Sequence, residues 1–156
     1  MIRAAVAADA DAIAAIWNRV IRDTTQTFTT EEKDAAALAR QMATQPYLVA
    51  GEQGAVTGFV TYFQFRGGPG YAYTVEHSVH IAVGARGRGL GRALMAACED
   101  HARGRGMHSI IAGVAGENAG GAAFHAALGY RQIARLPEVG WKFGRWHDLV
   151  LMQKML

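Results

Sequence analysis

The chain has 156 residues, 51% of them hydrophobic and 19% charged, and its formal net charge is +3 at pH 7. This length suits one domain with a full core, and the composition excludes a disordered chain. A net charge of +3 is also too small to indicate nucleic-acid binding by itself. We therefore expect a single domain over residues 1–156.

The hydrophobic pattern predicts helices and strands that alternate along the chain. Apolar residues recur at helical spacing after Asp9 or Asp11, either of which could be an N-cap, and again after Thr30, the expected N-cap of a second helix. Two strands rich in β-branched and aromatic residues are joined at Glu52–Gly54. In chain order we expect a strand at 2–6, helices at 8–24 and 29–45, two strands within 46–65, a glycine-rich loop at 66–73, a strand at 74–83, a helix at 90–106, a strand at 108–114, a helix at 118–128, and strands at 130–136 and 146–156. This order is typical of an α/β or α+β domain built on one sheet.

Nothing in the sequence indicates export or membrane insertion. Asp9 and Asp11 interrupt the alanine-rich N-terminus before a signal-peptide core could form, and no later run approaches transmembrane length. The single cysteine, Cys98, cannot form an internal disulfide, and its place on the apolar face of a predicted helix indicates a core residue rather than a nucleophile. We expect a cytoplasmic protein.

The stretch VGARGRGLGRAL, residues 83–94, concentrates glycine and arginine between a predicted strand and a predicted helix. A Walker A loop would end in Gly-Lys-Ser/Thr, and the stretch has no lysine. A dinucleotide fingerprint would need a further glycine where Leu94 stands, and an acid at the end of the next strand, which the chain lacks. Neither nucleotide motif therefore explains this stretch.

A turn that cradles a pyrophosphate suits the same stretch better. Successive backbone N–H groups at a helix N-terminus bind phosphate, and glycine lets the backbone approach it closely. An ordinary strand-to-helix turn with solvated arginines is the alternative. The residues expected to form the cradle are Gly87, Arg88, Gly89, Leu90, Gly91 and Arg92, with Arg86 at its rim.

The motif RGRGLG, residues 86–91, resembles the Arg/Gln-x-x-Gly-x-Gly/Ala signature of the GNAT superfamily of acetyl-CoA-dependent N-acetyltransferases. Residues 74–83 (TVEHSVHIAV), 125–130 (HAALGY) and 139–153 (VGWKFGRWHDLVLMQ) resemble the branch that acetylates phosphinothricin and methionine sulfone or sulfoximine. The resemblance implies a GNAT acyl-CoA N-acyltransferase fold, an α+β architecture with a mixed, mostly antiparallel sheet and helices on both faces. It also implies a sheet that splays between the strand of Glu76 and the strand of Ser109, where the pantetheine arm enters.

Amine acetylation needs a group that takes the proton of the attacking amine, whose pKa is about 8 or above. Glu76 is the candidate, because a carboxylate at the start of a largely apolar strand is costly unless it is exposed or functional. An edge glutamate in solvent is the alternative, and the resemblance favours the base, which the branch carries at this glutamate. Strand alternation places Glu76, Ser78 and His80 on one face, and His77, Val79, Ile81 and Val83 on the other.

The resemblance also implies which residues hold acetyl-CoA. Pantetheine resembles a short peptide, so the backbone of Val79, His80 and Ile81 can bind it through main-chain hydrogen bonds. Asn118 matches a family asparagine that contacts the cofactor, and on sequence alone it is equally a helix N-cap. His125 stands where many relatives carry a tyrosine that can protonate the departing thiolate. Packing, or a hydrogen bond to the cofactor, is the alternative for His125.

The acceptor is expected on the other side of the strand. Arg66 matches the position where the branch holds the substrate's carboxylate, which a guanidinium can grip with two N–H groups, and a surface arginine without a role is the alternative. Lys142 and Trp146 are further candidates. The methionine-sulfone enzymes tend to carry a second arginine where this chain has Ala72. The residues expected to contact the acceptor are Arg66, Gly67, Gly68, Glu76, His77 and Ser78.

These observations predict an acetyl-CoA-dependent N-acetyltransferase that acts on a small amino-acid-like amine by direct attack. No metal is expected, because His77 and His80 lie on opposite faces of one strand and no further ligand completes a set. The alternatives are a protein N-terminal or polyamine acetyltransferase and a non-catalytic acyl-CoA-binding sensor. Since the branch is usually dimeric, we expect a homodimer, with no nucleic-acid or membrane partner.

Overall fold

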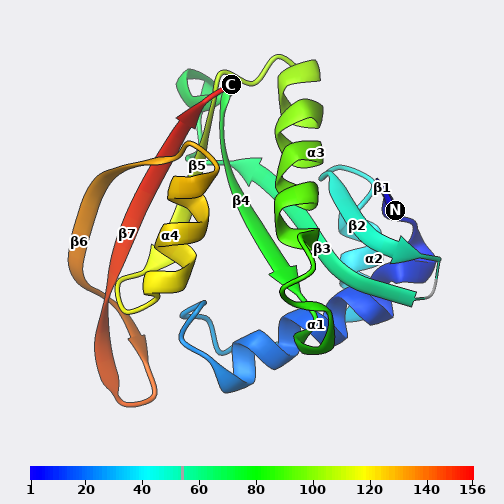
Figure 1. Cartoon of the computed structure of the whole chain (residues 1–156), viewed down its shortest axis with the longest axis horizontal. Helices are drawn as coiled ribbons and strands as arrows, with labels where there is room; N and C mark the ends of the chain where they lie inside the picture. The colour runs from blue at the N-terminus through cyan, green and yellow to red at the C-terminus, as the bar shows by residue number, and fades with distance from the viewer. Residues whose placement is uncertain (54) are drawn as a thin grey trace.

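The structure, a computed structural model, describes residues 1–53 and 55–156. Within these residues, the strands form one sheet in the order β1-β2-β3-β4-β5-β7-β6 (Figure 1). The strands are β1 (Ile2–Ala4), β2 (Tyr47–Glu52), β3 (Ala55–Gln64), β4 (Thr74–Ile81), β5 (Ser109–Ala115), β6 (Arg131–Lys142) and β7 (Arg145–Met155). The helices are α1 (Ala10–Asp23), α2 (Ala35–Gln41), α3 (Leu90–Gly104) and α4 (Ala119–Ala127), with short 3-10 turns η1 (Ala7–Asp9), η2 (Pro69–Tyr71) and η3 (Val83–Ala85). Gly54, the last residue of the expected β2–β3 turn, lies outside the described residues.

Neighbouring strands are antiparallel except for β4 and β5, which run parallel. Parallel strands need a long crossover, and α3 supplies it between β4 and β5. The predicted mixed, mostly antiparallel sheet is therefore confirmed.

Side chains alternate between the two faces of the sheet, and helices cover both faces. On β3, Phe59 belongs to a core cluster with Ile13 of α1 and Leu38 of α2. Its neighbour Val60 belongs to the opposite cluster, which includes Leu94 of α3. Partly buried side chains of α4 pack against that second cluster as well. The expected placement of helices on both faces is confirmed.

The sheet opens between β4 and β5. Their pairing runs from Thr74 opposite Ser109 only as far as His77 opposite Ala112, whereas β3 pairs with β4 as far as Ile81. Figure 1 shows the two strands running apart beyond this point. The backbone of β4 from residue 78 to 81 thus has no strand partner on its β5 side, as the predicted splay requires.

The second predicted helix is wrong in its first part, because α2 has Asp34 as its N-cap and not Thr30. The Asp34 carboxylate accepts a hydrogen bond from the backbone N–H of Ala37 at 2.8 Å. Before it, Asn18 of α1 holds the backbone of Lys33 on both sides, accepting from its N–H at 2.6 Å and donating to its carbonyl at 3.0 Å. These contacts with α1 keep the residues before Asp34 out of the helix, against a local sequence that favours it.

Strand ends also differ from the prediction. β1 ends at Ala4 rather than at residue 6, and β4 ends at Ile81 because Val83 belongs to η3, so Val83 shares no strand face with His77. At the C-terminus, β6 and β7 form one long hairpin that runs past the expected ends at 136 and 146. A register shift between Leu136 and Gly140 accommodates Pro137 without ending the strand. No helix in the described residues has the length and apolarity needed to span a membrane.

Candidate active site

A cavity of about 360 Å³ lies beside the unpaired end of β4. One wall is the β4 segment from Val79 to Ile81, and the other is the N-terminal part of α4 with its N-cap Asn118. The lining residues are Gln26, Val79, His80, Ile81, Arg86, Gly91, Asn118, Gly120, Gly121, Phe124 and His125. The cavity therefore offers a free strand edge to a peptide-like ligand, as a pantetheine arm would require. We call it the cofactor cavity.

The loop that enters α3 has the properties of a phosphate cradle. Gly87 and Gly89 have φ values of 76° and 77°, and a Cβ on either would meet no atom within 4 Å. Gly89 is the N-cap of α3 and supplies no side-chain hydrogen bond, so the first N–H groups of the helix have no side-chain acceptor from the cap. Arg88 and Arg92 are exposed beside it. Open space, bare N–H groups and positive charge together suit the pyrophosphate of coenzyme A.

Gly91 differs from the two glycines before it. A Cβ at Gly91 would lie 3.2 Å from the ring of Phe124 on α4, which is closer than ordinary van der Waals contact. The absence of a side chain here permits the close packing of α3 and α4 along the cofactor cavity. Helix packing is thus a further reason for glycine at this position, and its predicted contact with the phosphate stays a prediction.

Asn118 caps α4, as one of its two predicted roles required. Its Oδ1 accepts a hydrogen bond from the backbone N–H of Gly121 at 2.9 Å. Since Asn118 also lines the cofactor cavity, the cap and a contact with the cofactor are compatible.

A second cavity, of about 550 Å³, opens on the other face of β4. It is lined by Trp17, Gln26, Thr27, Thr29, Lys33, Gln41, Gln45, Tyr47, Phe63, Glu76, His77, Ser78, Val79, His80 and His125. We call it the acceptor cavity. The two cavities share four lining residues, Gln26, Val79, His80 and His125, so they meet at the open end of β4.

Glu76 lines the acceptor cavity and is half-buried. Burial raises the pKa of its carboxyl above the ordinary glutamate value. In the described part of the chain no ion pair or hydrogen bond involves this carboxylate, so nothing lowers its pKa in return. A carboxylate with a raised pKa and free lone pairs is suited to accept a proton near neutral pH.

His80 lines both cavities, but its ring packs in the core. The ring lies 5.5 Å from that of Phe59 and 5.9 Å from that of Trp17, measured between centroids. Burial, followed by the charge of Arg86, lowers the pKa of His80 to about 4. The imidazole is therefore neutral near pH 7, and its side chain is held on the α1 face of the sheet.

His77 and His125 form a buried pair where β4 and β5 separate. Their rings stack with centroids 5.1 Å apart, and the two Nε2 atoms are 3.2 Å apart. Burial lowers the pKa of His77 to about 3, with smaller contributions from His125 and His80. Burial also lowers the pKa of His125. Both rings are thus neutral near pH 7.

The partners of the pair assign its protons. His125 Nδ1 lies 2.8 Å from the carbonyl oxygen of Gly121, which can only accept, so Nδ1 carries the proton. The neutral His125 must then accept at Nε2, and His77 donates its Nε2–H to it. In this state His125 has no second N–H to give to a departing thiolate. The arrangement favours packing over acid catalysis for His125.

The residues expected to hold the acceptor's carboxylate are not part of the lining of the acceptor cavity. Arg66, Gly67 and Gly68 are exposed and none of them belongs to its lining. The guanidinium of Arg66 lies 5.5 Å above the ring of Tyr71 instead. The amide of Gln64 donates to the carbonyls of Arg66 and Gly68 and fixes the shape of this loop.

Residues 13–130 match the family described as Acetyltransferase (GNAT) family. The chain belongs to the GNAT family. It is 41% identical over 160 residues to the L-methionine sulfoximine/L-methionine sulfone acetyltransferase of Salmonella typhimurium, covering 99% of this chain and 94% of that protein.

Two solved structures extend the comparison. A phosphinothricin acetyltransferase from Sinorhizobium meliloti, in complex with acetyl-CoA, has a TM-score of 0.93 and 32% identity, covering 100% of this chain and 88% of that one. A ribosomal-protein-alanine N-acetyltransferase from Brucella melitensis has a TM-score of 0.95 and 37% identity, covering 100% and 99%. As a GNAT enzyme, the chain is an N-acetyltransferase whose co-substrate is acetyl-CoA.

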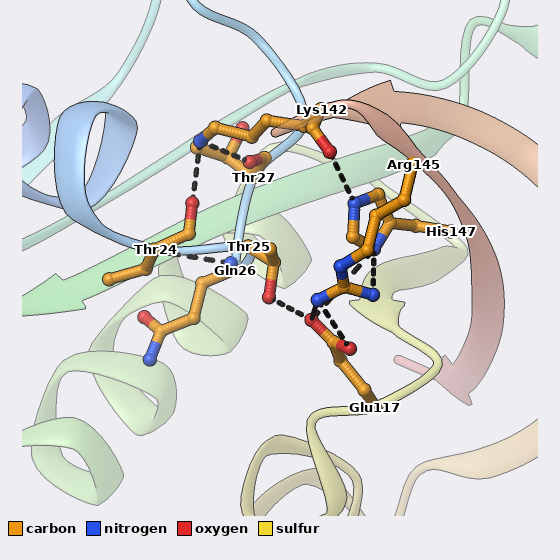
Figure 2. A network of polar contacts seen from close by, with 8 residues as sticks. All are labelled: Thr24, Thr25, Gln26, Thr27, Glu117, Lys142, Arg145 and His147. Carbon is orange, nitrogen blue, oxygen red and sulfur yellow. Dashed lines mark hydrogen bonds and ion pairs between the residues drawn. The ribbon is translucent and has the colours of Figure 1, made fainter.

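The predicted contact of Lys142 with the substrate is wrong. It is 1% exposed, and its Nζ donates to the carbonyl oxygens of Thr24 and Thr27 at 2.6 and 2.8 Å. Figure 2 shows the lysine reaching from the β6–β7 hairpin to this segment. Trp146, the other candidate, is 55% exposed and packs against Trp141 outside both cavities. A buried lysine was not expected, because lysine is rarely buried without partners.

A second set of contacts holds the same segment. The hydroxyl of Thr25 donates to Glu117, and Arg145 of β7 donates two hydrogen bonds to that carboxylate at 3.0 Å (Figure 2). His147 donates from Nε2 to the carbonyl of Lys142 at 2.9 Å. The C-terminal hairpin therefore fixes the backbone that carries Gln26 between the two cavities.

Sequence reasoning missed several residues that line the acceptor cavity, among them Gln26 and Lys33 on the segment from residue 24 to 33. No local pattern marks them, because their position depends on Asn18 and Lys142. Only the excess of polar residues between the first two helices could have drawn attention to this segment.

The buried histidines predict a loss of stability in acid. Folded His77, with a pKa of about 3, stays neutral while the unfolded chain takes up a proton below about pH 6.5. The free energy of unfolding should therefore fall by about 1.4 kcal/mol per pH unit for this histidine between pH 6 and 4. Urea unfolding at several pH values should show a shallower fall in His77→Phe, and equal slopes in the two proteins would contradict the assignment.

Removal of the Lys142 ammonium should loosen the 24–33 segment. Lys142→Met leaves two partly buried carbonyls without this donor, at a cost of about 1–3 kcal/mol in the free energy of unfolding. Hydrogen exchange should increase in a peptide covering residues 24–33. Lys154→Met is the matched control, because Lys154 pairs with Glu99 away from this segment. Equal exchange in the two variants would show that Lys142 does not position the segment.

Proposed function

We propose that the chain transfers the acetyl group of acetyl-CoA to the α-amine of a small amino-acid-like acceptor of the methionine sulfone, methionine sulfoximine or phosphinothricin type. The observation that carries this proposal is the position of Glu76. Its half-buried carboxylate, with a raised pKa, lines the cavity that meets the cofactor cavity at Val79 and His80. The names of the relatives from Salmonella and Sinorhizobium support the class of acceptor.

In the proposed reaction the acceptor amine attacks directly. Bound acetyl-CoA supplies an acyl group activated as a thioester. The β4 backbone from Val79 to Ile81 offers main-chain hydrogen bonds to pantetheine, and the 87–92 backbone offers N–H groups to the pyrophosphate. Glu76 takes the proton that the amine loses, directly or through one water. His125 holds His77 and presents no proton to the thiolate, which leaves protonation to solvent.

Acetylation of a protein N-terminus is the second candidate. The high TM-score to the Brucella structure, named for ribosomal-protein alanine, favours it. A protein N-terminus and a free amino acid differ at the α-carboxylate, which is an amide in the protein. The charges of the acceptor cavity therefore bear on this choice.

A thiol-release assay with acetyl-CoA tests the proposal. The panel contains methionine sulfone, methionine sulfoximine, phosphinothricin, common amino acids, spermidine and a peptide N-terminus. We expect turnover on the first three compounds, and a decrease of about 10²- to 10⁴-fold in kcat for Glu76→Gln. Turnover on the peptide or spermidine alone would contradict the proposed acceptor.

The pH profile isolates the role of Glu76. A base must be unprotonated, so kcat/KM should fall in acid around the raised pKa of Glu76. Glu76→Gln should lose this acid limb and keep the limb at higher pH that comes from the amine of the acceptor. An acid limb that persists in Glu76→Gln would assign it to another group.

We also infer a homodimer, formed through the β6–β7 hairpin. Large apolar side chains are exposed there, which is typical of an interface; they are Ile133, Val139, Trp141, Phe143 and Trp146. Sedimentation should show a dimer for the wild type and a monomer for Trp146→Glu. Tyr73→Glu is the matched control, since Tyr73 is an exposed aromatic outside the hairpin. A wild-type monomer would contradict the inference.

The cytoplasmic location of the protein stays a prediction.

A further inference from the structure

Two opposite charges line the acceptor cavity. Lys33 supplies the positive charge and Glu76 the negative one. The histidines of the lining are neutral near pH 7, because burial lowers the pKa of each. A ligand with one cationic and one anionic end therefore has one counter-charge of each sign within the described lining.

The position of Lys33 is fixed by α1. Asn18 accepts from the Lys33 N–H at 2.6 Å and donates to its carbonyl at 3.0 Å. The Lys33 ammonium lies 4.6 Å from the centroid of the Trp17 ring, a cation–π contact. Trp17 also lines the acceptor cavity, so its ring holds the ammonium at this wall. Backbone and side chain are thus both placed before any ligand binds.

No carboxylate in the described residues forms an ion pair with Lys33. Its acidic neighbours are engaged elsewhere, because Glu32 pairs with Arg22 and Asp34 caps α2. Three neutral polar side chains of the wall take part in hydrogen bonds within the protein. Tyr47 donates to Gln41 at 2.6 Å, and Gln45 donates to Thr61 at 2.7 Å. The ammonium of Lys33 is thus the charged donor that the wall leaves available to an anion.

We propose that Lys33 binds the carboxylate of the acceptor while Glu76 faces its amine. This assignment rests on the proposed acetylation of an amino-acid-like amine, and it makes Lys33 a specificity-determining residue. Arg66, the residue expected in this role, is exposed and does not line the cavity, so the proposal assigns the carboxylate to Lys33 instead. The site then selects α-amino acids with a free carboxylate over amines that lack one, including peptide N-termini.

The test compares an acceptor with its uncharged analogue. L-Methionine sulfone and its α-carboxamide are assayed with the wild type, Lys33→Met, Lys33→Arg and Arg66→Met. We expect Lys33→Met to raise KM for the amino acid about 10- to 100-fold, the effect of losing a hydrogen bond between charged groups, with KM for the carboxamide and kcat little changed. Lys33→Arg should restore much of the preference for the acid, because it restores the charge. Arg66→Met should behave as the wild type.

Several outcomes separate the possibilities. A rise in KM that is equal for acid and carboxamide, or a selective loss in Arg66→Met alone, would overturn the role of Lys33. Acetyl-CoA affinity by calorimetry should be unchanged in Lys33→Met, which shows that the variant is folded. If Lys33→Met does not fold, Lys33→Gln replaces it under the same criteria. Failure of the wild type on every amino-acid-like acceptor would overturn the proposed function itself, a result that requires no variant.

Discussion

The end of pairing between β4 and β5 is the constraint on which the site depends. A buried strand edge without a partner is costly, because its N–H and C=O groups lose their hydrogen bonds to water. From residue 78 to 81, β4 has a partly buried edge without a strand partner toward the cofactor cavity. The stacked rings of His77 and His125 lie where the strands part, and they join β4 to α4. Beyond this contact the cofactor cavity separates β4 from α4, and the edge stays open for a peptide-like ligand.

Loss of solvation explains the shifted pKa values of the carboxyl group and of the histidines around that edge. It raises the pKa of Glu76, which stabilises the protonated carboxyl, and lowers the pKa values of His77 and His80, which stabilises the neutral rings. The two effects support one another. A positively charged imidazole beside Glu76 would lower the pKa of the carboxyl and make it a weaker base. Neutral histidines keep that charge away without leaving a void in the core.

The parts that could be predicted from sequence depend on neighbours close in the chain. The strand around Glu76, the glycine turn and the Asn118 cap are set by alternation, backbone conformation and local hydrogen bonds. The 24–33 segment could not be predicted, because contacts distant in sequence decide its path. Lys142 reaches Thr24 across 118 positions. Because lysine is usually exposed to solvent, the sequence suggests that Lys142 contacts a substrate, whereas it binds backbone carbonyls in the interior.

The two cavities are built from different parts of the chain. The cofactor cavity is lined mainly by residues between 79 and 125, whereas nine residues of the acceptor lining lie between 17 and 63. Among the residues that the structure describes, Gln26, Val79, His80 and His125 belong to both. Substitutions between 27 and 47 can therefore change the lining of the acceptor cavity and leave that of the cofactor cavity intact. Two proteins named for different acceptors share the fold of this chain, with TM-scores of 0.93 and 0.95, as such a separation permits.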